Sequence, residues 1–380
     1  MLKKIVSVIL ALTLIVAVFA SCSKRQVVIV ESSSDVSSTT SSSDSSTTSS
    51  NSSSTTSSTT SSTTSSTTSS TTSSATNTKF KLTQAKPVIK FDNEKDVIIC
   101  WGDSLTEGMA MLLGYKYPKQ LQADIKSQFK VINAGVSGET SNEIASRANL
   151  VEIVLTKDIV FEKGSDRVEL TREFVSVKGG EVLQYKGFGR DLSMSKVIIG
   201  GKTYQMAFRN GDTWDKGVYT LIRTDKTQKE TLKKGTTVKY DYSAHYKTVY
   251  CNVILMGAND QNVSIDELIA RYRNLGSSSS KNIYIIPYYY KEDADGSITA
   301  KFKEAFGDQA LDVRSYFVNH AHEDYDLEKT EVDKYCIRKN MVPATFCLNG
   351  NRDDCHLSEI GYKVMADQIY QLGVKLGYWK

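Results

Sequence analysis

Short hydrophobic runs alternate with amphipathic segments along the chain from about residue 96 onward. Runs such as 248–256 (TVYCNVILM) are typical of buried strands, whereas 357–376 carries hydrophobic residues at helical spacing. Ser264 is a candidate helix cap, and Thr140 or Ser141 with Glu143 nearby indicates a capping box. The predicted strands are 96–101, 130–133, 248–256, 282–290 and 310–316, and the predicted helices are 118–129, 140–153, 264–275, 299–306 and 357–376.

Strands that alternate with helices predict a parallel sheet covered by helices on both faces, which is a three-layer α/β/α sandwich. Residues 154–247 interrupt this rhythm. They alternate Val, Thr, Phe, Tyr and Lys, with turn signals at 179–180, 200–201 and 210–212. Short strands with frequent turns favour a β-rich insertion, folded as a sandwich or a small barrel.

The first residues of the chain resemble a bacterial lipoprotein signal. Basic residues precede a hydrophobic stretch that is short for a membrane span, and small residues stand before Cys22, with Phe19 where that signal prefers Leu. The resemblance implies that residues 1–21 are a signal peptide and that Cys22 carries a lipid anchor on the extracytoplasmic face of the cell membrane. An ordinary signal peptide cut near Ala20 and an uncleaved anchor remain alternatives.

Residues 22–79 are expected to be a disordered linker. Of the 47 residues at 32–78, 41 are Ser or Thr, which cannot bury enough hydrophobic surface to fold. The linker is either a stalk that extends a domain from the membrane or a neutral tether. The predicted domain organisation is therefore an α/β core at 80–153 and 248–380, with the insertion 154–247 between its two parts.

Composition narrows the classes of function. The net charge of the whole chain is +4, so we expect no nucleic-acid partner. A single long hydrophobic run excludes a polytopic membrane protein. Of the six cysteines, Cys100 and Cys251 fall in predicted strands and are expected to be buried. An exported protein permits a disulfide among the other three in the core, and Cys347–Cys355 and Cys336–Cys347 are both candidates.

Three polar motifs lie where predicted elements end or begin. Ser104 follows the first strand, in the sequence GDSL, and Asn259 follows the strand 248–256, in the sequence GAND. His356 precedes the closing helix and stands three residues after Asp353. Side chains at the carboxyl ends of parallel strands converge on one edge of the sheet. A serine, a histidine with an orienting carboxylate and an amide donor together predict nucleophilic catalysis.

Each motif also has an ordinary structural explanation. Ser104 is compatible with a helix cap, the GAND sequence with a simple turn, and Asp353 to His356 with a capped helix entry. Asp354 competes with Asp353 for the orienting role, although the spacing favours Asp353.

With these motifs in this order, the chain resembles the SGNH or GDSL hydrolases, a superfamily of serine esterases with a flavodoxin-like α/β/α core. The resemblance covers about residues 95–150 and 248–380. The matching blocks are 101–108 (WGDSLTEG), 133–141 (NAGVSGETS), 257–260 (GAND) and 353–356 (DDCH).

The resemblance implies a role for each matching residue. Ser104 is the expected nucleophile, His356 the base and Asp353 the residue that orients His356. The N–H groups of Ser104 and Gly138 and the side chain of Asn259 are the expected oxyanion donors. Gly135 is the alternative to Gly138, whose SGET context fits better.

The expected function is that of an extracytoplasmic serine esterase that hydrolyses acyl esters, with O-acetyl groups on a polysaccharide as the expected substrate. The mechanism requires no metal and no organic cofactor. A lipase or thioesterase is one alternative, and a glycan-binding surface lipoprotein whose insertion does the binding is another.

Other polar and aromatic residues offer less support for a role in the site. His320 and His322 are spaced like metal ligands, but a solvated loop is the favoured interpretation, and His245 is interpreted as structural. The tyrosines at 288–290 either stack on a sugar or pack in the core.

Overall fold

The computed structural model describes residues 97–108, 116–189, 191–192, 196–209, 218–289, 293–352 and 356–380. The predicted signal peptide, Cys22, the linker and the turn at 210–212 lie outside the described residues. Among the described residues, no helix combines the length and the hydrophobicity needed to cross a bilayer.

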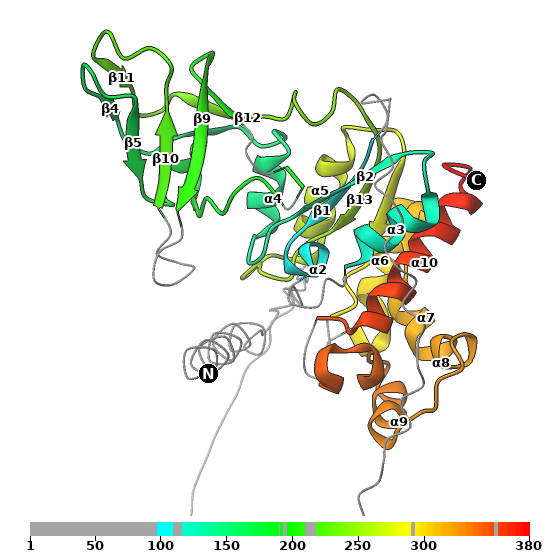
Figure 1. The fold of residues 1–380 in the computed structure, drawn as a ribbon. Helices are drawn as coiled ribbons and strands as arrows, with labels where there is room; N and C mark the ends of the chain where they lie inside the picture. Colours follow the sequence, from blue (N-terminus) through cyan, green and yellow to red (C-terminus); the bar gives the residue numbers. More distant parts are fainter. Residues whose placement is uncertain are drawn as a thin grey trace, which may run out of the picture. The chain divides into compact units, whose positions relative to one another are not determined.

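The described part of the fold is mixed α/β, with a parallel sheet and a separate antiparallel sheet (Figure 1). Five parallel strands form the first sheet, in the spatial order β15-β14-β13-β1-β2. Their bounds are β1 Val97–Gly102, β2 Lys130–Gly135, β13 Val249–Leu255, β14 Asn282–Ile285 and β15 Ala310–Leu311. Read by sequence, this order is 2-1-3-4-5, which is common among doubly wound α/β sheets.

Successive residues of β1 contribute to two different hydrophobic cores, as expected for a strand buried on both faces. Val97, Ile99 and Trp101 pack in one core with side chains of α4, α5 and α6. Ile98 and Cys100 pack in the other with side chains of α2, α3, α7 and α10. The helices are α2 Ser104–Glu107, α3 Tyr117–Ile125, α4 Ser141–Arg147, α5 Ile265–Gly276, α6 Ser297–Phe306, α7 Val313–Asn319, α8 Ala321–Asp324, α9 Glu331–Arg338 and α10 Glu359–Lys375.

Two predicted helix starts are confirmed in detail. The Ser264 side chain accepts from the Glu267 N–H and caps α5. Thr140 and Glu143 form a reciprocal capping box at the start of α4. Short 3₁₀ turns lie at Asp293–Asp295, Gly307–Gln309, Ala344–Phe346 and Leu348–Gly350.

The predicted helix 140–153 is too long, because α4 ends at Arg147. Asn149 adopts the left-handed conformation with a φ of 59°. Its side-chain amide exchanges two hydrogen bonds of 2.8 Å with the backbone of Tyr240, in the insertion strand β12 (Thr237–Asp241). Ile153 then begins the next strand, so a contact with the insertion terminates this helix.

The predicted strands 282–290 and 310–316 are also shorter than expected. Pro287 has no N–H with which to extend β14, which ends at Ile285. Only Ala310 and Leu311 form β15, because the Asp312 side chain accepts from the Ser315 N–H and starts α7. Helices α2, α7, α8 and α9 were not predicted.

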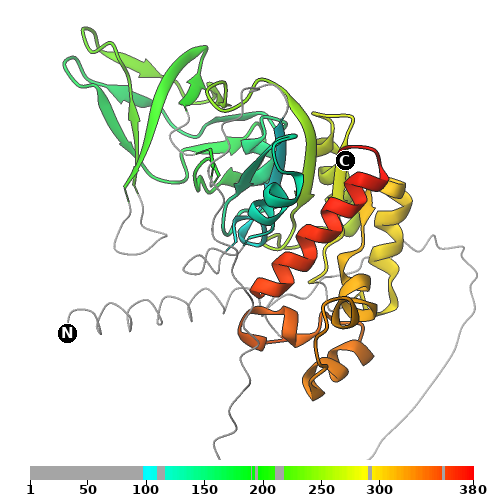
Figure 2. The same ribbon diagram turned by 45° about the vertical axis from the view of Figure 1, so that its right-hand side comes forward.

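The predicted β-rich insertion is confirmed as strands β3 to β12. Eight strands form one antiparallel sheet in the order β5-β10-β9-β8-β12-β3-β6-β7, and β4 pairs with β11. The strand bounds are β3 Ile153–Leu155, β4 Ile159–Phe161, β5 Arg167–Leu170, β6 Val175–Val177, β7 Val182–Leu183, β8 Lys196–Ile199, β9 Lys202–Arg209, β10 Val218–Ile222, β11 Glu230–Leu232 and β12 Thr237–Asp241. The green strands of this sheet lie beside α4 in both ribbon views (Figure 2).

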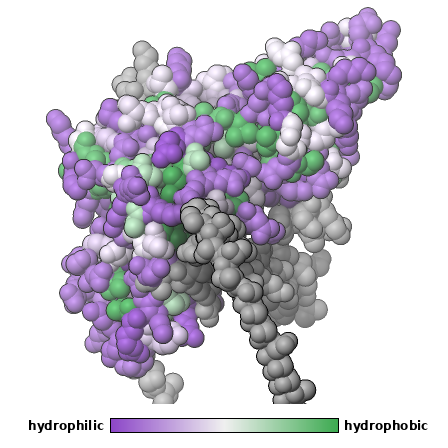
Figure 3. Space-filling view, turned by 180° about the vertical axis from the view of Figure 1, so that it is seen from behind, coloured by the Kyte–Doolittle hydropathy of each residue, from purple (hydrophilic) through white to green (hydrophobic). Residues whose placement is uncertain are grey.

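The insertion shares a core with the parallel sheet. Tyr185, Phe188 and Tyr242 are buried and belong to the cluster that contains Trp101. The face in Figure 3 is mainly hydrophilic with smaller hydrophobic areas. The large hydrophobic side chains that stay exposed in the described segments are Val160, Val182, Val332, Tyr335 and Val374.

Candidate active site

The site is built at the carboxyl ends of three neighbouring parallel strands. Gly102 of β1 pairs in register with Gly135 of β2 and with Leu255 of β13. The loops that follow these strands therefore leave the sheet at the same edge. The strand order reverses at β1, which is where ligand-binding crevices form in open α/β sheets.

Ser104 is the first residue of α2, and Asp103 is the residue that caps this helix. The Asp103 carboxylate accepts from the Leu105 N–H at 2.9 Å. At the other end, the Gly108 N–H donates to the Ser104 carbonyl at 3.0 Å, with a φ of 82° at Gly108. Because Asp103 supplies the cap, the alternative in which Ser104 is itself the helix cap is wrong.

His356 contacts Ser104 although 252 residues separate them in the sequence. The His356 Nε2 lies 2.9 Å from the Ser104 Oγ, and the two residues are 4% and 8% exposed. The His356 carbonyl accepts from the Leu348 N–H, which fixes the backbone before α10. Ser358 caps α10, so His356 is not the helix cap. Asp353, Asp354 and Cys355 lie outside the described residues.

Asn259 and Gly138 are linked through the intervening Glu139. The Asn259 side-chain amide donates to the Glu139 carbonyl at 2.9 Å, and Gly138 has a φ of 76°. The GAND segment also forms the turn expected of it, because the Asp260 N–H donates to the Gly257 carbonyl at 3.2 Å. The turn thus carries the Asn259 side chain across to the loop after β2.

Gly135 differs from Gly138 in how its N–H is used. The Gly135 N–H donates to the Asn133 side-chain oxygen at 2.9 Å. A Cβ on Gly135 would lie 2.2 Å from the backbone nitrogen of Glu107, far inside a normal contact. Gly135 therefore allows α2 to approach β2 closely. The Asn133 side-chain amide also donates to the Thr106 carbonyl at 3.1 Å, which braces the same approach.

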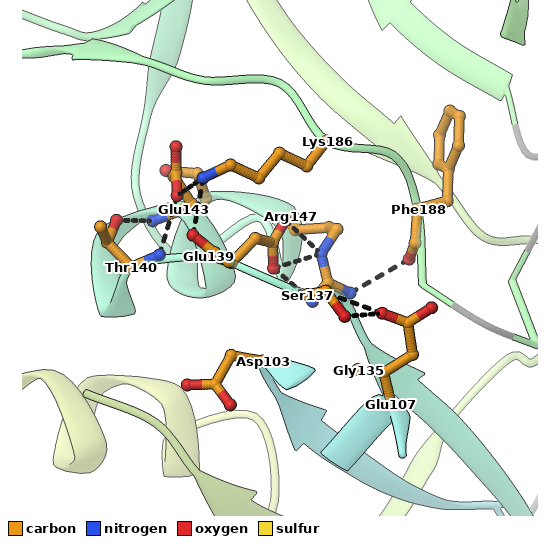
Figure 4. A network of polar contacts seen from close by, with 12 residues as sticks. Asp103, Glu107, Gly135, Ser137, Glu139, Thr140, Glu143, Arg147, Lys186 and Phe188 are labelled. Atoms are coloured by element: carbon orange, nitrogen blue, oxygen red, sulfur yellow. Dashed lines mark hydrogen bonds and ion pairs between the residues drawn. The ribbon is translucent and has the colours of Figure 1, made fainter. Parts of the chain in front are cut away.

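Three acidic residues organise the loop after β2, and sequence reasoning assigned none of them a role in the site (Figure 4). The Glu107 carboxylate accepts from the N–H and the hydroxyl of Ser137, at 2.7 and 2.5 Å. Glu139 forms a buried ion pair with Arg147, and Glu143 pairs with Lys186 of the insertion. Glu107 and Glu139 stand inside the matching sequence blocks, but nothing in those blocks indicates their partners.

The Glu139–Arg147 pair is buried deeply enough to change its electrostatics. Burial raises the pKa of Glu139 to about 7, and the charge and hydrogen bonds of Arg147 oppose that rise. Burial lowers the pKa of Arg147, but the charge and hydrogen bonds of Glu139 outweigh it and raise the pKa above its ordinary value. The guanidinium carbon also lies 5.3 Å from the centre of the Trp101 ring.

The interpretation of His322 as part of a solvated loop is wrong. His322 is 2% exposed, lies in α8, and places its Nε2 3.5 Å from the Asp333 carboxylate. Burial lowers its pKa, and Asp333 opposes that effect. His320 is exposed at the junction of α7 and α8. Within the described ranges, no group of three or more His, Cys, Asp or Glu side chains is arranged to hold a metal ion.

The remaining candidates are placed as follows. Tyr288 is buried, and the Tyr289 hydroxyl donates to the Met256 carbonyl at 2.9 Å, whereas residue 290 lies outside the described residues. His245 is partly exposed just after β12. Cys100 and Cys251 are buried as predicted, and burial raises the pKa of both thiols.

Comparison with known proteins does not identify a function, so the function has to be inferred from the chemistry of the site. No family model matches the chain, and no curated protein matches its sequence.

Proposed function

We propose that the protein is a serine esterase in which Ser104 is the nucleophile and His356 the general base. The observation that carries the proposal is the 2.9 Å contact between the Ser104 Oγ and the His356 Nε2. These two residues come from opposite ends of the core sequence and lie at the carboxyl edge of a parallel sheet. Both are buried but retain a small exposed area. A hydroxyl within hydrogen-bond distance of an imidazole is the arrangement that activates a serine.

The proposed reaction has two steps. His356 takes the Ser104 proton as Oγ attacks the ester carbonyl, and then returns it to the departing alcohol, which leaves an acyl-enzyme. His356 then deprotonates a water that attacks the acyl group, and gives that proton to the departing Ser104 Oγ as the acid is released. Asp353 is assigned to orient His356 by accepting from its Nδ1–H.

The proposed oxyanion hole consists of the N–H groups of Ser104 and Gly138 and the Asn259 side chain. Asn259 has two amide hydrogens. The bond to the Glu139 carbonyl uses one of them and fixes the orientation of the amide, and the other hydrogen is the proposed donor to the oxyanion. The bond between the Gly135 N–H and Asn133 supports Gly138 over Gly135 as the donor. A pre-oriented amide donor stabilises the tetrahedral charge without reorganising during the reaction.

The proposed fold family is the SGNH hydrolases, with a three-layer α/β/α core. The 2-1-3-4-5 strand order and the presence of helical side chains in both core clusters support this assignment. The proposed setting is the extracytoplasmic face of a membrane, with a lipid on Cys22. Acetyl esters on a polysaccharide are the proposed substrate, because an enzyme anchored at the cell surface is close to cell-wall and external polysaccharides.

The test is the hydrolysis of p-nitrophenyl esters, from acetate to octanoate, by the full chain and its Ser104→Ala variant. We expect activity on acetate, and a loss of at least about 10⁴-fold in kcat on substitution. Ser243→Ala is the matched control, because Ser243 is exposed and lies outside the site. Release of acetate from acetylated xylan would then support the glycan substrate, whereas a preference for octanoate would favour a lipase.

Two results would refute the esterase. The first is an inert parent chain that also fails to react with a fluorophosphonate at Ser104. The second is activity that survives in Ser104→Ala. Binding of glycans by an inert parent would favour the alternative of a surface glycan-binding protein.

A further inference from the structure

The insertion reaches back to the loop that carries Gly138. The segment after β7 forms four hydrogen bonds with this region, three with α4 and one with Gly138 before it. Figure 4 shows Lys186 and Phe188 of this segment beside α4. The Gln184 N–H donates to the Glu143 Oε1 at 2.8 Å, Lys186 donates to the same carboxylate, and the Phe188 carbonyl accepts from Arg147 at 3.0 Å. The segment is therefore attached to both ends of α4.

Among the residues of this segment, Lys186 contacts Gly138, whose N–H is a proposed oxyanion donor. Its Nζ lies 2.8 Å from the Gly138 carbonyl oxygen and 2.7 Å from the Glu143 Oε2. The Lys186 and Glu143 side chains are 12% and 6% exposed, so solvent screens this pair little. A charge-assisted hydrogen bond of this length is among the stronger ones in proteins.

Glu143 holds the Lys186 ammonium in one place because its own carboxylate is fixed. Besides Lys186, it accepts from the Thr140 N–H at 2.8 Å and from the Gln184 N–H. Each carboxylate oxygen thus has a backbone donor. The ammonium is positioned by the start of α4 rather than by a flexible surface residue.

The peptide that Lys186 holds lies between two of the three proposed oxyanion donors, the Gly138 N–H and the Asn259 side chain. The Gly138 carbonyl belongs to the peptide unit that joins Gly138 to Glu139. On the far side of that unit, the Glu139 carbonyl accepts from Asn259 at 2.9 Å. Gly138 has a φ of 76°, and because glycine adopts positive and negative φ about equally readily, the residue itself does little to hold this conformation. The Gly138 N–H and the Glu139 carbonyl belong to the two adjacent peptide units, so a displacement of this peptide would shift the Gly138 N–H and the acceptor of Asn259 together.

We infer that Lys186 is a positioning residue for the oxyanion hole, so the insertion is a working part of the reaction centre. This inference rests on the proposed esterase function. Lys186 touches no substrate atom in this account. It acts through Gly138 and Glu139 by restraining the peptide between the two donors.

The experiment compares full-length Lys186→Met, Lys186→Arg and parent protein in p-nitrophenyl acetate hydrolysis. We expect kcat of Lys186→Met to fall about 10–100-fold with a KM within about threefold of the parent, because misplaced oxyanion donors weaken transition-state binding. Lys186→Arg keeps the charge and donors and should restore most of kcat. Lys178→Met is the control, since the Lys178–Glu152 pair lies in the same region but is exposed.

The outcomes separate this inference from the proposed function. If the parent is active and Ser104→Ala is not, but a folded Lys186→Met keeps its kcat, the positioning role is wrong and the esterase stands. If Lys186→Met loses its thermal transition, Lys186→Gln carries the same test, because its shorter side chain cannot span both acceptors. A fall in kcat that Lys186→Arg does not rescue, or an equal fall in Lys178→Met, also refutes the inference. An inert parent refutes the function itself.

Discussion

Replacing Arg147 by Met would remove one partner of the buried ion pair next to the proposed site. The Arg147 Nε lies 3.0 Å from both carboxylate oxygens of Glu139, and Nη2 lies 2.7 Å from one of them. Nη1 donates to the Phe188 carbonyl at 3.0 Å. The two charged side chains are 0% and 3% exposed, so water cannot replace the lost donors.

The magnitude follows from this burial. Removing one partner of a buried, hydrogen-bonded ion pair typically lowers the free energy of unfolding by about 3–5 kcal/mol, a factor of roughly 10²–10⁴ in the folding equilibrium. An exposed pair contributes only about 0–1 kcal/mol. Lys178–Glu152, with side chains 64% and 47% exposed and 3.1 Å between Nζ and Oε2, is such a pair. Lys178→Met is therefore the matched control.

The loss should also depend on pH. Burial already raises the pKa of Glu139 to about 7 while Arg147 opposes the rise, so Arg147→Met should raise it further. A carboxyl whose pKa is higher in the folded state than in the unfolded state loses stabilisation as the pH rises. The deficit of Arg147→Met relative to the parent should thus be larger at pH 9 than at pH 6.

The assay is urea unfolding of the parent, Arg147→Met, Lys178→Met and the double variant Glu139→Leu/Arg147→Met. Removing both charges leaves no unpaired ion, so the double variant should be more stable than Arg147→Met alone. A loss below about 1 kcal/mol in Arg147→Met, the range of an exposed pair, would refute the stabilising role of this buried ion pair. A double variant as unstable as Arg147→Met would refute it equally.

Three further predictions concern other parts of the described structure. Asn259→Ala should lower kcat about 10²–10³-fold with little change in Tm, as kinetics and calorimetry would show, and unchanged kcat would remove it from the oxyanion hole. Gly135→Ala should lower the free energy of unfolding by at least about 1–3 kcal/mol in urea titrations, because its Cβ would meet the Glu107 backbone, and wild-type stability would contradict that close approach. The pKa values of both His322 and Asp333 lie below their ordinary values, so protonation of each group should destabilise the fold as the pH falls below its unfolded pKa. An Asp333→Asn/His322→Gln variant should therefore lose less stability than the parent as the pH is lowered, and an equal loss would show that these two groups are not its cause.

Sequence signals predicted helix starts and strands reliably where the residues responsible lie within a few positions of one another. Ser264 caps α5 as predicted because the side chain and the N–H that it accepts lie three residues apart. The strand 248–256 was recognised because burial on both faces requires a continuous hydrophobic run. Prediction failed where a distant segment intervened, as at Asn149, whose bonds to Tyr240 end α4 early.

Hydrophobic periodicity and capping are local properties of a chain. They were enough to predict the alternation of strands and helices, the β-rich insertion, and the positions of Ser104, Asn259 and His356 at element ends. The resemblance led to the expectation that His356 serves Ser104, but their contact across 252 residues is visible only in the folded chain. The contact between Lys186 and Gly138 had no signal in the sequence. Such contacts depend on how separate elements pack against one another, and local periodicity and spacing do not reveal that arrangement.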